Sequence, residues 1–494
     1  MGRANLGISG ALGIAGALGL GLGCTPTPPP RPPDVLLVVL DTVRADALPI
    51  GGNPRNTAPQ VQAIADAGRV FTQAVAPGCW TWPVHASLFT GQDPWVHGAH
   101  HAALDDVLAG APIATSLDRS LPTLAEAFTA AGYRTASISA NGLLGPGSEL
   151  VRGFAKAELY DDDDDRVVQR AQQLLSDDDP RPVFIFVNLL GSHLPYEAWP
   201  TAWTAPHAAA LHPDTAPDWL GPWLSVESGR PHLRLNRPAP DGGPAPVRAF
   251  SAGQWAPGPE GLALLKDVYE SEVLATDALL HRLMQTWNAT GRGAGITLVT
   301  SDHGEHFGEQ DMLDHGHGVW GAVTHVPLVI AAPGRVVPGT DDQPVSLSRV
   351  APTLISLAGI EGAAATAILT QPSLLAEDVP AAPVVSACWA DPVWAQQLGG
   401  RFVHDQWMLR DGPLALVDIG DNSLLFNVLD DPMMLKDLSS AQPDAVRRLR
   451  ALLAQQRPPT TDRTGERPTL SPGTIEAMQQ LGYLDPPPGP PRGD

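Results

Sequence analysis

Apolar segments of strand length recur along this 494-residue chain and alternate with segments of helical pattern. The first apolar segment is Val35–Leu40, which Asp41 follows directly, and a later one, Ile296–Ser301, runs into Asp302. Short, uninterrupted apolar runs of this kind are typical of strands buried on both faces of a sheet. Because such strands alternate with helices, the sequence predicts an α/β fold: a mostly parallel central sheet with helices on both faces.

The other elements of this main domain follow from the same patterns. We expect helices over 57–67, 121–131, 166–175 and 262–287. Further strands are expected over 134–140, 183–190 and 327–332. Ser120 is the expected N-cap of the second helix, and Gly132 is its expected end. The acidic runs 161–165 and 177–179 are interpreted as solvated helix starts, with a calcium site as the alternative.

Two segments depart from this alternation. Residues 199–258 are rich in Pro, Gly, Trp and His and are interpreted as an irregular insertion, either a lid over a site or a surface excursion. From about residue 382, short strand-like runs precede a helical segment over 444–455. This pattern predicts a smaller C-terminal α+β subdomain over 382–484, which leaves 34–381 as the main domain. The Pro- and Gly-rich residues 485–494 are expected to be a disordered tail.

Charge and cysteine content exclude two classes of protein. The chain has 53 acidic and 31 basic residues, a formal net charge of −22, so no nucleic-acid partner is expected. Three cysteines in 494 residues exclude a disulfide scaffold and a Cys-rich zinc module. Cys79 is interpreted as a small buried hydrophobic residue.

The N-terminal residues predict export. Arg3 precedes an apolar run over 6–22 that is too short and too rich in glycine for a membrane-spanning helix, so 1–24 reads as a signal peptide. Cys24 then opens a Pro-rich tether over 25–33, as in a bacterial lipoprotein whose cysteine carries the lipid. Plain secretion and a retained anchor are the alternatives. All three place the domain in the periplasm or at the cell exterior, with membrane contact only through this anchor.

Carboxylates at two strand ends point to a metal site. Ligands of open α/β sheets bind beyond the carboxyl ends of the strands, so Asp41 and Asp302–His303 can converge although they lie far apart in sequence. Two carboxylates and one imidazole suit one divalent ion, Ca, Mn or Zn, with Mg also possible. Capping of loops and turns is the alternative role of these side chains.

A third stretch, residues 76–91, is expected to be a loop that runs into a short helix ending at Gly91. A hydroxyl at the entry of that helix faces free backbone amides, which favour a bound anion. Beside a divalent metal, such a hydroxyl becomes a usable nucleophile.

Taken in order, these stretches resemble the sulfatase-like branch of the alkaline phosphatase superfamily. The resemblance covers about residues 34–484 and rests on short motifs at 41–46, 83–91, 132–135, 193–196, 301–305, 315–317, 326–328, 427–432 and 481–484. It implies an alkaline phosphatase-like fold, with 34–381 as the catalytic domain. It also implies Asp41, Thr81, Asp302 and His303 as the metal ligands.

The resemblance places Thr81, two residues before Pro83, at the nucleophile position. True sulfatases have a Cys or Ser there that is converted to formylglycine, and threonine cannot be converted. A formylglycine hydrate releases sulfate by collapsing to an aldehyde, whereas a threonine sulfate lacks this route. A threonine phosphate is a workable covalent intermediate, so the substitution favours phosphate esters over sulfate esters.

Further histidines and one asparagine complete the implied site. His315 is the expected proton donor to the leaving oxygen, and His193 is expected to contact the substrate anion as a second catalytic histidine. His85, Asn141 and His317 are expected to bind substrate. Structural roles in loops are the alternative for each of these residues.

The resulting functional expectation is a metal-dependent, sulfatase-like hydrolase. It cleaves phosphate or sulfate esters of a small molecule or a head group through Thr81 and a covalent intermediate. A phosphotransferase acting on lipid or glycan head groups is the first alternative. A non-catalytic surface lipoprotein that keeps the fold is the second.

Overall fold

The computed structural model describes residues 31–103, 106–107, 113–238, 243–376 and 381–457. The predicted signal peptide, Cys24, the tail and the motif at 481–484 lie outside the described residues. The compact unit that contains the described helices and strands begins at Pro33. In the part of the chain that the structure describes, no helix is long and apolar enough to cross a membrane.

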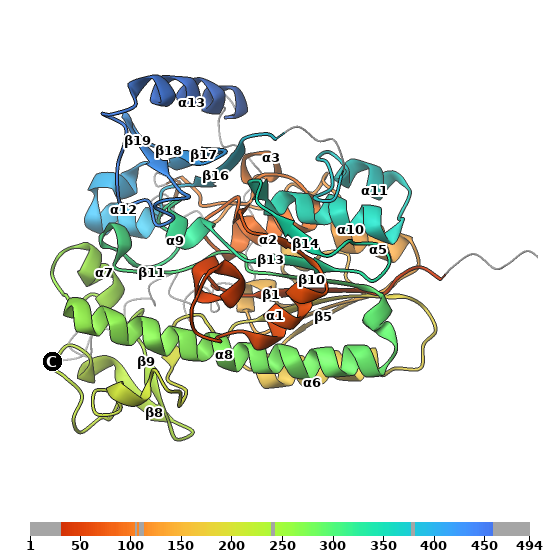
Figure 1. Ribbon diagram of the computed structural model, residues 1–494, viewed down its shortest axis with the longest axis horizontal. Coiled ribbons are helices and arrows are strands. Elements are labelled where there is room, and N and C mark those ends of the chain that lie inside the picture. Colours follow the sequence, from red (N-terminus) through yellow and green to blue (C-terminus); the bar gives the residue numbers. More distant parts are fainter. Residues whose placement is uncertain (1–30, 104–105, 108–112, 239–242, 377–380, 458–494) are drawn as a thin grey trace, which may run out of the picture. The chain divides into compact units, whose positions relative to one another are not determined.

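A central sheet of eight strands carries the main domain (Figure 1). Its strands, in spatial order, are β14 (Gly339–Asp341), β2 (Arg69–Phe71), β13 (Leu328–Ala331), β10 (Ile296–Thr300), β1 (Val35–Leu40), β6 (Val183–Leu189), β4 (Arg134–Ser139) and β5 (Lys156–Leu159). Only β13 is antiparallel to its neighbours β10 and β2; the remaining described strands run in one direction. The predicted, mostly parallel sheet is therefore confirmed.

Strand β1 explains why helices cover both faces of this sheet. All six of its residues are buried, and its side chains alternate between two cores. Val35, Leu37 and Val39 pack with α2 (Thr81–Thr90), α5 (Leu124–Ala130) and α10 (Val350–Ala358). Leu36, Val38 and Leu40 pack with α1 (Pro59–Asp66), α6 (Asp164–Leu175) and α8 (Gly258–Ala289). Burial of each such side chain stabilises the fold by about 1.5–3 kcal/mol, so exposure of either face of β1 to water would be unfavourable.

Helix boundaries show where the sequence patterns were misread. The helix predicted over 121–131 begins at Leu124, because Thr123 rather than Ser120 is its N-cap. Thr123 and Glu126 form a reciprocal capping box, which satisfies two backbone N–H groups at once. The assignment of Ser120 was therefore wrong, whereas Asp163 does cap α6 as expected for an acidic helix start.

The segment predicted as an irregular insertion contains only short elements among its described residues. Strands β8 (Leu224–Glu227) and β9 (Arg230–Leu233) form a hairpin that pairs with β7 (Tyr196–Glu197). Helix α7 (Pro246–Ser251) follows before α8 begins. Figure 1 shows the hairpin beside one end of α8.

The predicted C-terminal subdomain is present. Strands β16 (Val384–Cys388), β17 (Gln406–Asp411), β18 (Leu414–Ile419) and β19 (Asn422–Asn427) form an antiparallel sheet in sequence order. Helix α13 (Pro443–Gln456) packs on one face of it through Leu449 and Leu453. The other face of β16 joins the main core through Val384 and Cys388.

Candidate active site

Polar side chains from four neighbouring strands meet at the carboxyl ends of β1, β6, β4 and β10. Asp41 directly follows β1, and its Oδ2 accepts hydrogen bonds from Asn141 Nδ2 at 2.9 Å and from Asn188 Nδ2 at 3.0 Å. Asn141 lies just beyond β4, and Asn188 lies within β6. All three side chains are fully buried. Sequence reasoning missed Asn188, although it is the one polar residue in an otherwise apolar strand.

Asp302 and His303 reach the same point from the end of β10. Asp302 Oδ1 accepts the backbone N–H groups of Thr42 at 3.2 Å and His303 at 2.9 Å. Thr42 adopts a left-handed backbone conformation, with φ of 62°, in the turn that presents its N–H. His303 Nδ1 donates to the Gly304 carbonyl, so Nε2 is the nitrogen that faces Asp302 Oδ2 at 3.3 Å and Asp41 Oδ1 at 3.9 Å.

These residues fit a divalent metal ion. One ligand atom from each of Asp41, Asp302 and His303 lies within 4.8 Å of the others. Asp302 Oδ2 is buried and has no hydrogen-bond partner among the described residues. Burial and the neighbouring Asp41 hold the pKa of Asp302 well above its usual range, and a cation between the two carboxylates offsets that cost. Oxygen ligands with one imidazole nitrogen suit the ions named above.

Thr81 stands beside this cluster as the first residue of α2. Its Oγ1 lies 3.4 Å from His303 Nε2 and 3.5 Å from Asn141 Nδ2. The fold thus brings together Asp41, Thr81, Asn141, Asp302 and His303 from four separate parts of the sequence. The first turn of α2 also places its backbone amides on this side.

His85 lies one turn further along α2. Its Nδ1 donates to the Thr81 carbonyl at 3.0 Å and lies 3.5 Å from Asp302 Oδ2. Its Nε2 has no hydrogen-bond partner among the described residues. Burial lowers the pKa of His85 to about 4, so the ring is neutral at neutral pH. It therefore positions the backbone of Thr81 and adds no positive charge.

His315 and His193 continue the cluster beyond His303. The His315 ring lies 4.2 Å from the His303 ring, and the His193 ring lies 4.8 Å from that of His315, centroid to centroid. His315 Nδ1 is 3.0 Å from Asp314 Oδ1 and 3.4 Å from Glu305 Oε2. Burial raises the pKa of Glu305 to about 7 and lowers that of His193. The role of Glu305 was missed, although the residue ends the motif at 301–305.

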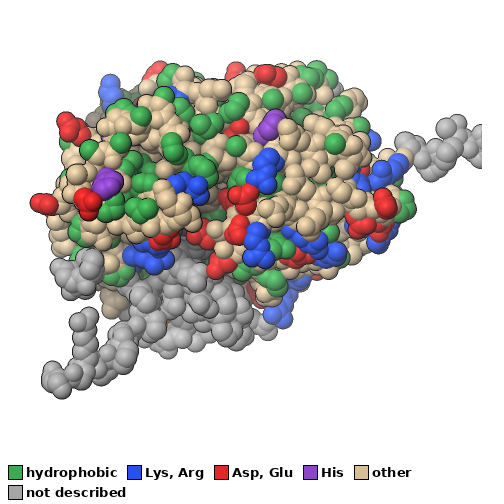
Figure 2. Space-filling model, turned by 90° about the horizontal axis from the view of Figure 1, so that it is seen from below, with side chains coloured by type: hydrophobic (Ala, Val, Ile, Leu, Met, Phe, Trp, Pro, Cys, Tyr) green, Lys and Arg blue, Asp and Glu red, His purple; other side chains and the backbone are tan. Residues whose placement is uncertain are grey.

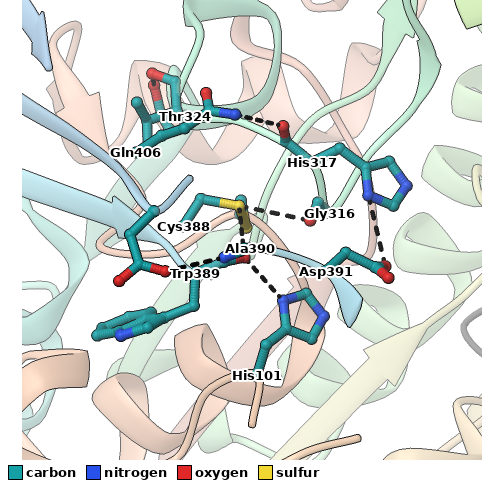
Figure 3. Close-up of a disulfide and its surroundings, with 12 residues drawn as sticks. His101, Gly316, His317, Thr324, Cys388, Trp389, Ala390, Asp391 and Gln406 are labelled. Atoms are coloured by element: carbon teal, nitrogen blue, oxygen red, sulfur yellow. Dashed lines mark hydrogen bonds and ion pairs between the residues drawn. A yellow bond between two sulfur atoms is a disulfide. The ribbon is translucent and has the colours of Figure 1, made fainter. Parts of the chain in front are cut away.

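His317 is not drawn into this cluster. Its ring stacks on Trp394 of α12 (Pro392–Leu398) with centroids 3.6 Å apart. Its Nδ1 lies 3.5 Å from Asp391 Oδ2, as Figure 3 shows. Its backbone carbonyl accepts a hydrogen bond from Gln406 Nε2. The aromatic surface of the C-terminal subdomain thus holds this histidine, and a role in substrate binding stays a prediction.

Cys79 is bonded to Cys388, with their Cα atoms 5.5 Å apart. The interpretation of Cys79 as a small hydrophobic residue was therefore wrong; its partner lies 309 residues away, and no local spacing signals the pair. The disulfide joins the loop before Thr81 to the end of β16 (Figure 3). Backbone hydrogen bonds from Gly316 to Cys79 and from Ala387 to Pro77 reinforce the same junction.

Comparison with known proteins identifies a family. The family model described as Sulfatase matches residues 33–360. The ulvan-active sulfatase of Formosa agariphila is 23% identical over 370 residues, which cover 67% of this chain; the match spans 63% of that relative's length.

Solved structures agree on the fold. The phosphonate monoester hydrolase of Agrobacterium radiobacter superposes with a TM-score of 0.60 and 19% identity, covering 86% of this chain and 96% of that one. A 2-O GAG sulfatase superposes with a TM-score of 0.63 and 19% identity, covering 86% and 92%. The expected alkaline phosphatase-like fold is thereby confirmed, and the matches support the class of sulfuric or phosphoric ester hydrolases.

Proposed function

We propose that this chain, which belongs to the sulfatase family, is a metal-dependent hydrolase that cleaves phosphate or sulfate esters through Thr81. One observation carries the proposal: Thr81 Oγ1 stands at the start of α2, within 3.4 Å of His303 Nε2 and beside the Asp41, Asp302 and His303 cluster. The carboxylates of Asp41 and Asp302 beside this hydroxyl favour a bound cation. The backbone amides at the start of α2 favour a bound anion.

The residues of this chain divide the work of activating Thr81. Asp41, Asp302 and His303 would hold the metal ion, which would supply charge neutralisation and lower the pKa of the hydroxyl. Burial and His315 keep the pKa of His303 well below its usual range, so the ring stays neutral and offers a lone pair at Nε2. Asn141 Nδ2 binds Asp41 and approaches Thr81 Oγ1, and His85 anchors the Thr81 carbonyl.

His315 serves the leaving oxygen. Asp314 and Glu305 hold its Nδ1, which orients the ring and fixes the proton on that side. The Thr81 hydroxyl first loses its proton to solvent. As Oγ1 then forms a bond to phosphorus or sulfur, the bond to the leaving oxygen breaks, and that oxygen takes the Nε2 proton of the doubly protonated His315 ring, whose Nδ1 proton stays with the carboxylates. Water then attacks the threonine ester and releases inorganic phosphate or sulfate, which regenerates the hydroxyl.

The chemistry of threonine favours phosphate over sulfate among the two esters. A threonine ester cannot collapse to an aldehyde, so release of the bound phosphate or sulfate requires attack of water at phosphorus or sulfur. Phosphothreonine permits this step through in-line displacement at phosphorus, where the backbone amides at the start of α2 can bind the phosphoryl oxygens. The covalent intermediate at Thr81 is therefore the point on which the proposal depends.

Initial rates on three aryl esters test this proposal. The purified protein is assayed on a sulfate, a phosphate monoester and a phosphate diester with added Mn, Ca or Zn, beside Thr81→Ala. We expect metal-dependent phosphoester turnover that falls by about 10³-fold or more in the variant, because a missing nucleophile leaves only residual catalysis. Full activity in Thr81→Ala removes the nucleophile assignment, and sulfate turnover alone removes the preference for phosphate.

We also propose that the protein works outside the cytoplasm, anchored through Cys24. The Cys79–Cys388 disulfide supports export, since such bonds persist in oxidising compartments.

A further inference from the structure

A cavity of about 550 Å³ adjoins the catalytic histidines. Its walls are the loop after β6, one face of α8, the acidic segment before α6 and the β8–β9 hairpin. His193 lines it, and the rings of His193, His315 and His303 follow one another at 4.8 and 4.2 Å. The cavity therefore adjoins His315, the proposed proton donor, and is placed to hold the leaving group of the substrate.

Carboxylates outnumber basic side chains around this cavity. Eight Asp and Glu residues line it against three arginines. Arg230 pairs with Glu197, and Arg234 pairs with Glu227, so the hairpin wall is internally compensated. The excess negative charge belongs to the opposite wall. Figure 2 shows acidic and basic side chains lying next to one another on this face of the molecule.

Glu272 of α8 is the residue of that wall whose charge the protein leaves uncompensated. It is 3% exposed, and one carboxylate oxygen accepts the backbone N–H of Glu197. The other, Oε2, has no hydrogen-bond partner among the described residues. Burial, Asp162 and Asp164 hold the pKa of Glu272 well above its usual range. An acceptor buried without a donor is costly unless a ligand supplies one.

Neighbouring carboxylates, unlike Glu272, have hydrogen-bond partners for both oxygens. Glu270, two residues earlier on α8, is bonded to Arg55 at 2.7 Å and to Asn53 at 3.1 Å. Asp164 uses both oxygens on the backbone N–H groups of Leu190 and Gly191, each at 2.8 Å. Glu272, which lines the cavity, alone among these three carries a carboxylate oxygen that no donor among the described residues satisfies.

We propose that this cavity binds a primary ammonium group carried by the alcohol part of the substrate, with Glu272 Oε2 as its principal acceptor and Asp162 beside it. The inference rests on the proposed function, since it assigns the substrate class of that same site. It predicts esters of amino alcohols or amino sugars.

Two observations favour an ammonium group over other cations. Two groups of described His, Cys, Asp and Glu residues have ligand atoms close enough together to hold a metal ion. Neither group includes an acidic residue of this cavity. The aromatic face of Trp199, the surface that a quaternary ammonium prefers, is covered by the guanidinium of Arg230 at 4.0 Å. A primary ammonium needs only carboxylate and hydroxyl oxygens, which Glu272, Asp162 and Thr276 supply around the cavity.

Matched pairs of esters test the inference on the metal-loaded, full-length protein. The pairs are 2-aminoethyl phosphate with propyl phosphate and glucosamine 6-phosphate with glucose 6-phosphate, and the corresponding sulfates, followed by release of phosphate or sulfate. We expect kcat/KM to favour the ammonium member by about 10-fold or more, the usual weight of a hydrogen bond to a charged group. The pair with the larger preference tells an amino alcohol from an amino sugar.

Variants assign the preference to the cavity. Glu272→Gln keeps an acceptor for the Glu197 N–H but removes the charge, so the ratio within each pair is expected to fall to about one. Asp162→Asn, at the edge of the cavity, is expected to reduce the ratio in part and covers the case in which Glu272→Gln fails to fold. Glu260→Gln, at an exposed position at the start of the same helix, keeps the ratio of the unsubstituted protein.

Binding of ethylammonium chloride, followed by saturation-transfer NMR, separates the two proposals. If aryl esters are cleaved but both members of each pair react equally, the inference is overturned and the proposed function stands. If no ester is cleaved, the proposed function fails, and an ethylammonium signal that disappears in Glu272→Gln still supports the cavity. An unchanged signal in that variant, or a preference for a trimethylammonium ester, overturns the assignment of a primary ammonium.

Discussion

At the scale of single residues, Asp41 owes its position to two amides. Asn141 and Asn188 both donate to its Oδ2, which leaves Oδ1 on the side of His303. Such partners orient a metal ligand, and their loss commonly weakens metal binding about 10- to 100-fold. Asn188 Oδ1 also accepts from Ser139 Oγ at 3.1 Å, so its amide is held from both ends.

We therefore expect Asn188→Ala to lower the affinity for the activating metal by about 10- to 100-fold. Thermal unfolding followed during titration with Mn, Ca or Zn measures this. A bound metal at free concentration c stabilises the folded state by RT ln(1 + c/Kd), and a weaker site therefore needs more metal for the same rise in Tm. Ser137→Ala in β4 is the control, because Ser137 is equally buried in the sheet and has no hydrogen-bond partner among the described residues. Equal metal affinity in Asn188→Ala and the control contradicts an orienting role for Asn188.

The residues whose convergence the sequence predicted share one property: they stand where a strand ends. Asp41, Asp302 and His303 follow apolar runs directly, so topology alone places them at one edge of the sheet. Asn188 lies inside its strand, where polar residues are usually structural, and the pattern hid it. The contacts of His317 with Trp394 and Asp391 could not be predicted from local spacing, because these two residues belong to a subdomain distant in sequence.

At the scale of elements, helix α1 lacks a cap of its own. Ala58, its N-cap, has no side-chain acceptor, and Asp277 of α8 supplies one instead. Asp277 Oδ2 accepts the N–H of Gln60 at 2.8 Å, and Oδ1 accepts that of Val61 at 2.9 Å. A local sequence pattern cannot show a cap that comes from another helix. A neighbouring Thr can likewise outcompete a Ser, as at α5, where Glu126 selects Thr123.

Asp277 gives the stability of the protein a dependence on pH. Burial raises the pKa of Asp277 to about 6, whereas it is about 4 in an unfolded chain. Between these values the folded state keeps a proton that the unfolded state has lost, so this carboxyl destabilises the fold as pH rises from about 4 to about 6 and adds nothing further above that. The free energy of unfolding relative to Asp277→Asn should therefore fall across this window.

Urea denaturation between pH 4 and pH 8 measures this difference. The total change is expected to be at most about 3 kcal/mol, the equivalent of a pKa difference of about two units. Asp214→Asn, at a side chain that is 89% exposed, is the control and should leave the profile unchanged. A difference that grows with pH instead would mean that the dipole of α1 outweighs the burial of Asp277.

At the scale of the whole molecule, the class of fold was predictable but the assembly was not. Alternating periodicity identified the strands and helices, yet the order of eight strands and the reversed direction of β13 depend on contacts between distant segments. The same holds for the junction between the two sheets. Cys79 and Cys388 carry no mutual signal, and only the packing of β16 against the main core brings them together.

The disulfide links the proposed compartment to the stability of the active-site loop. It closes a loop with a sequence separation of 309 residues, for which restriction of the unfolded chain contributes up to about 5 kcal/mol. Protein exported with its N-terminal segment should form the bond, and protein made in a reducing cytoplasm from residue 33 should not. Mass spectrometry after thiol alkylation measures the bond, and denaturation of each form measures its effect.

Variants separate the effects of the proposed lipid anchor from those of the disulfide. Cys24→Ser should release the exported protein from the membrane fraction with the disulfide intact. Cys388→Ser should stay anchored but unfold at a lower denaturant concentration, and it should lose activity before global unfolding, because the bond fixes the loop only two residues before Thr81. Unpaired thiols in the exported protein contradict the proposed compartment. Equal activity and stability in Cys388→Ser contradict a role for the bond in holding the nucleophile.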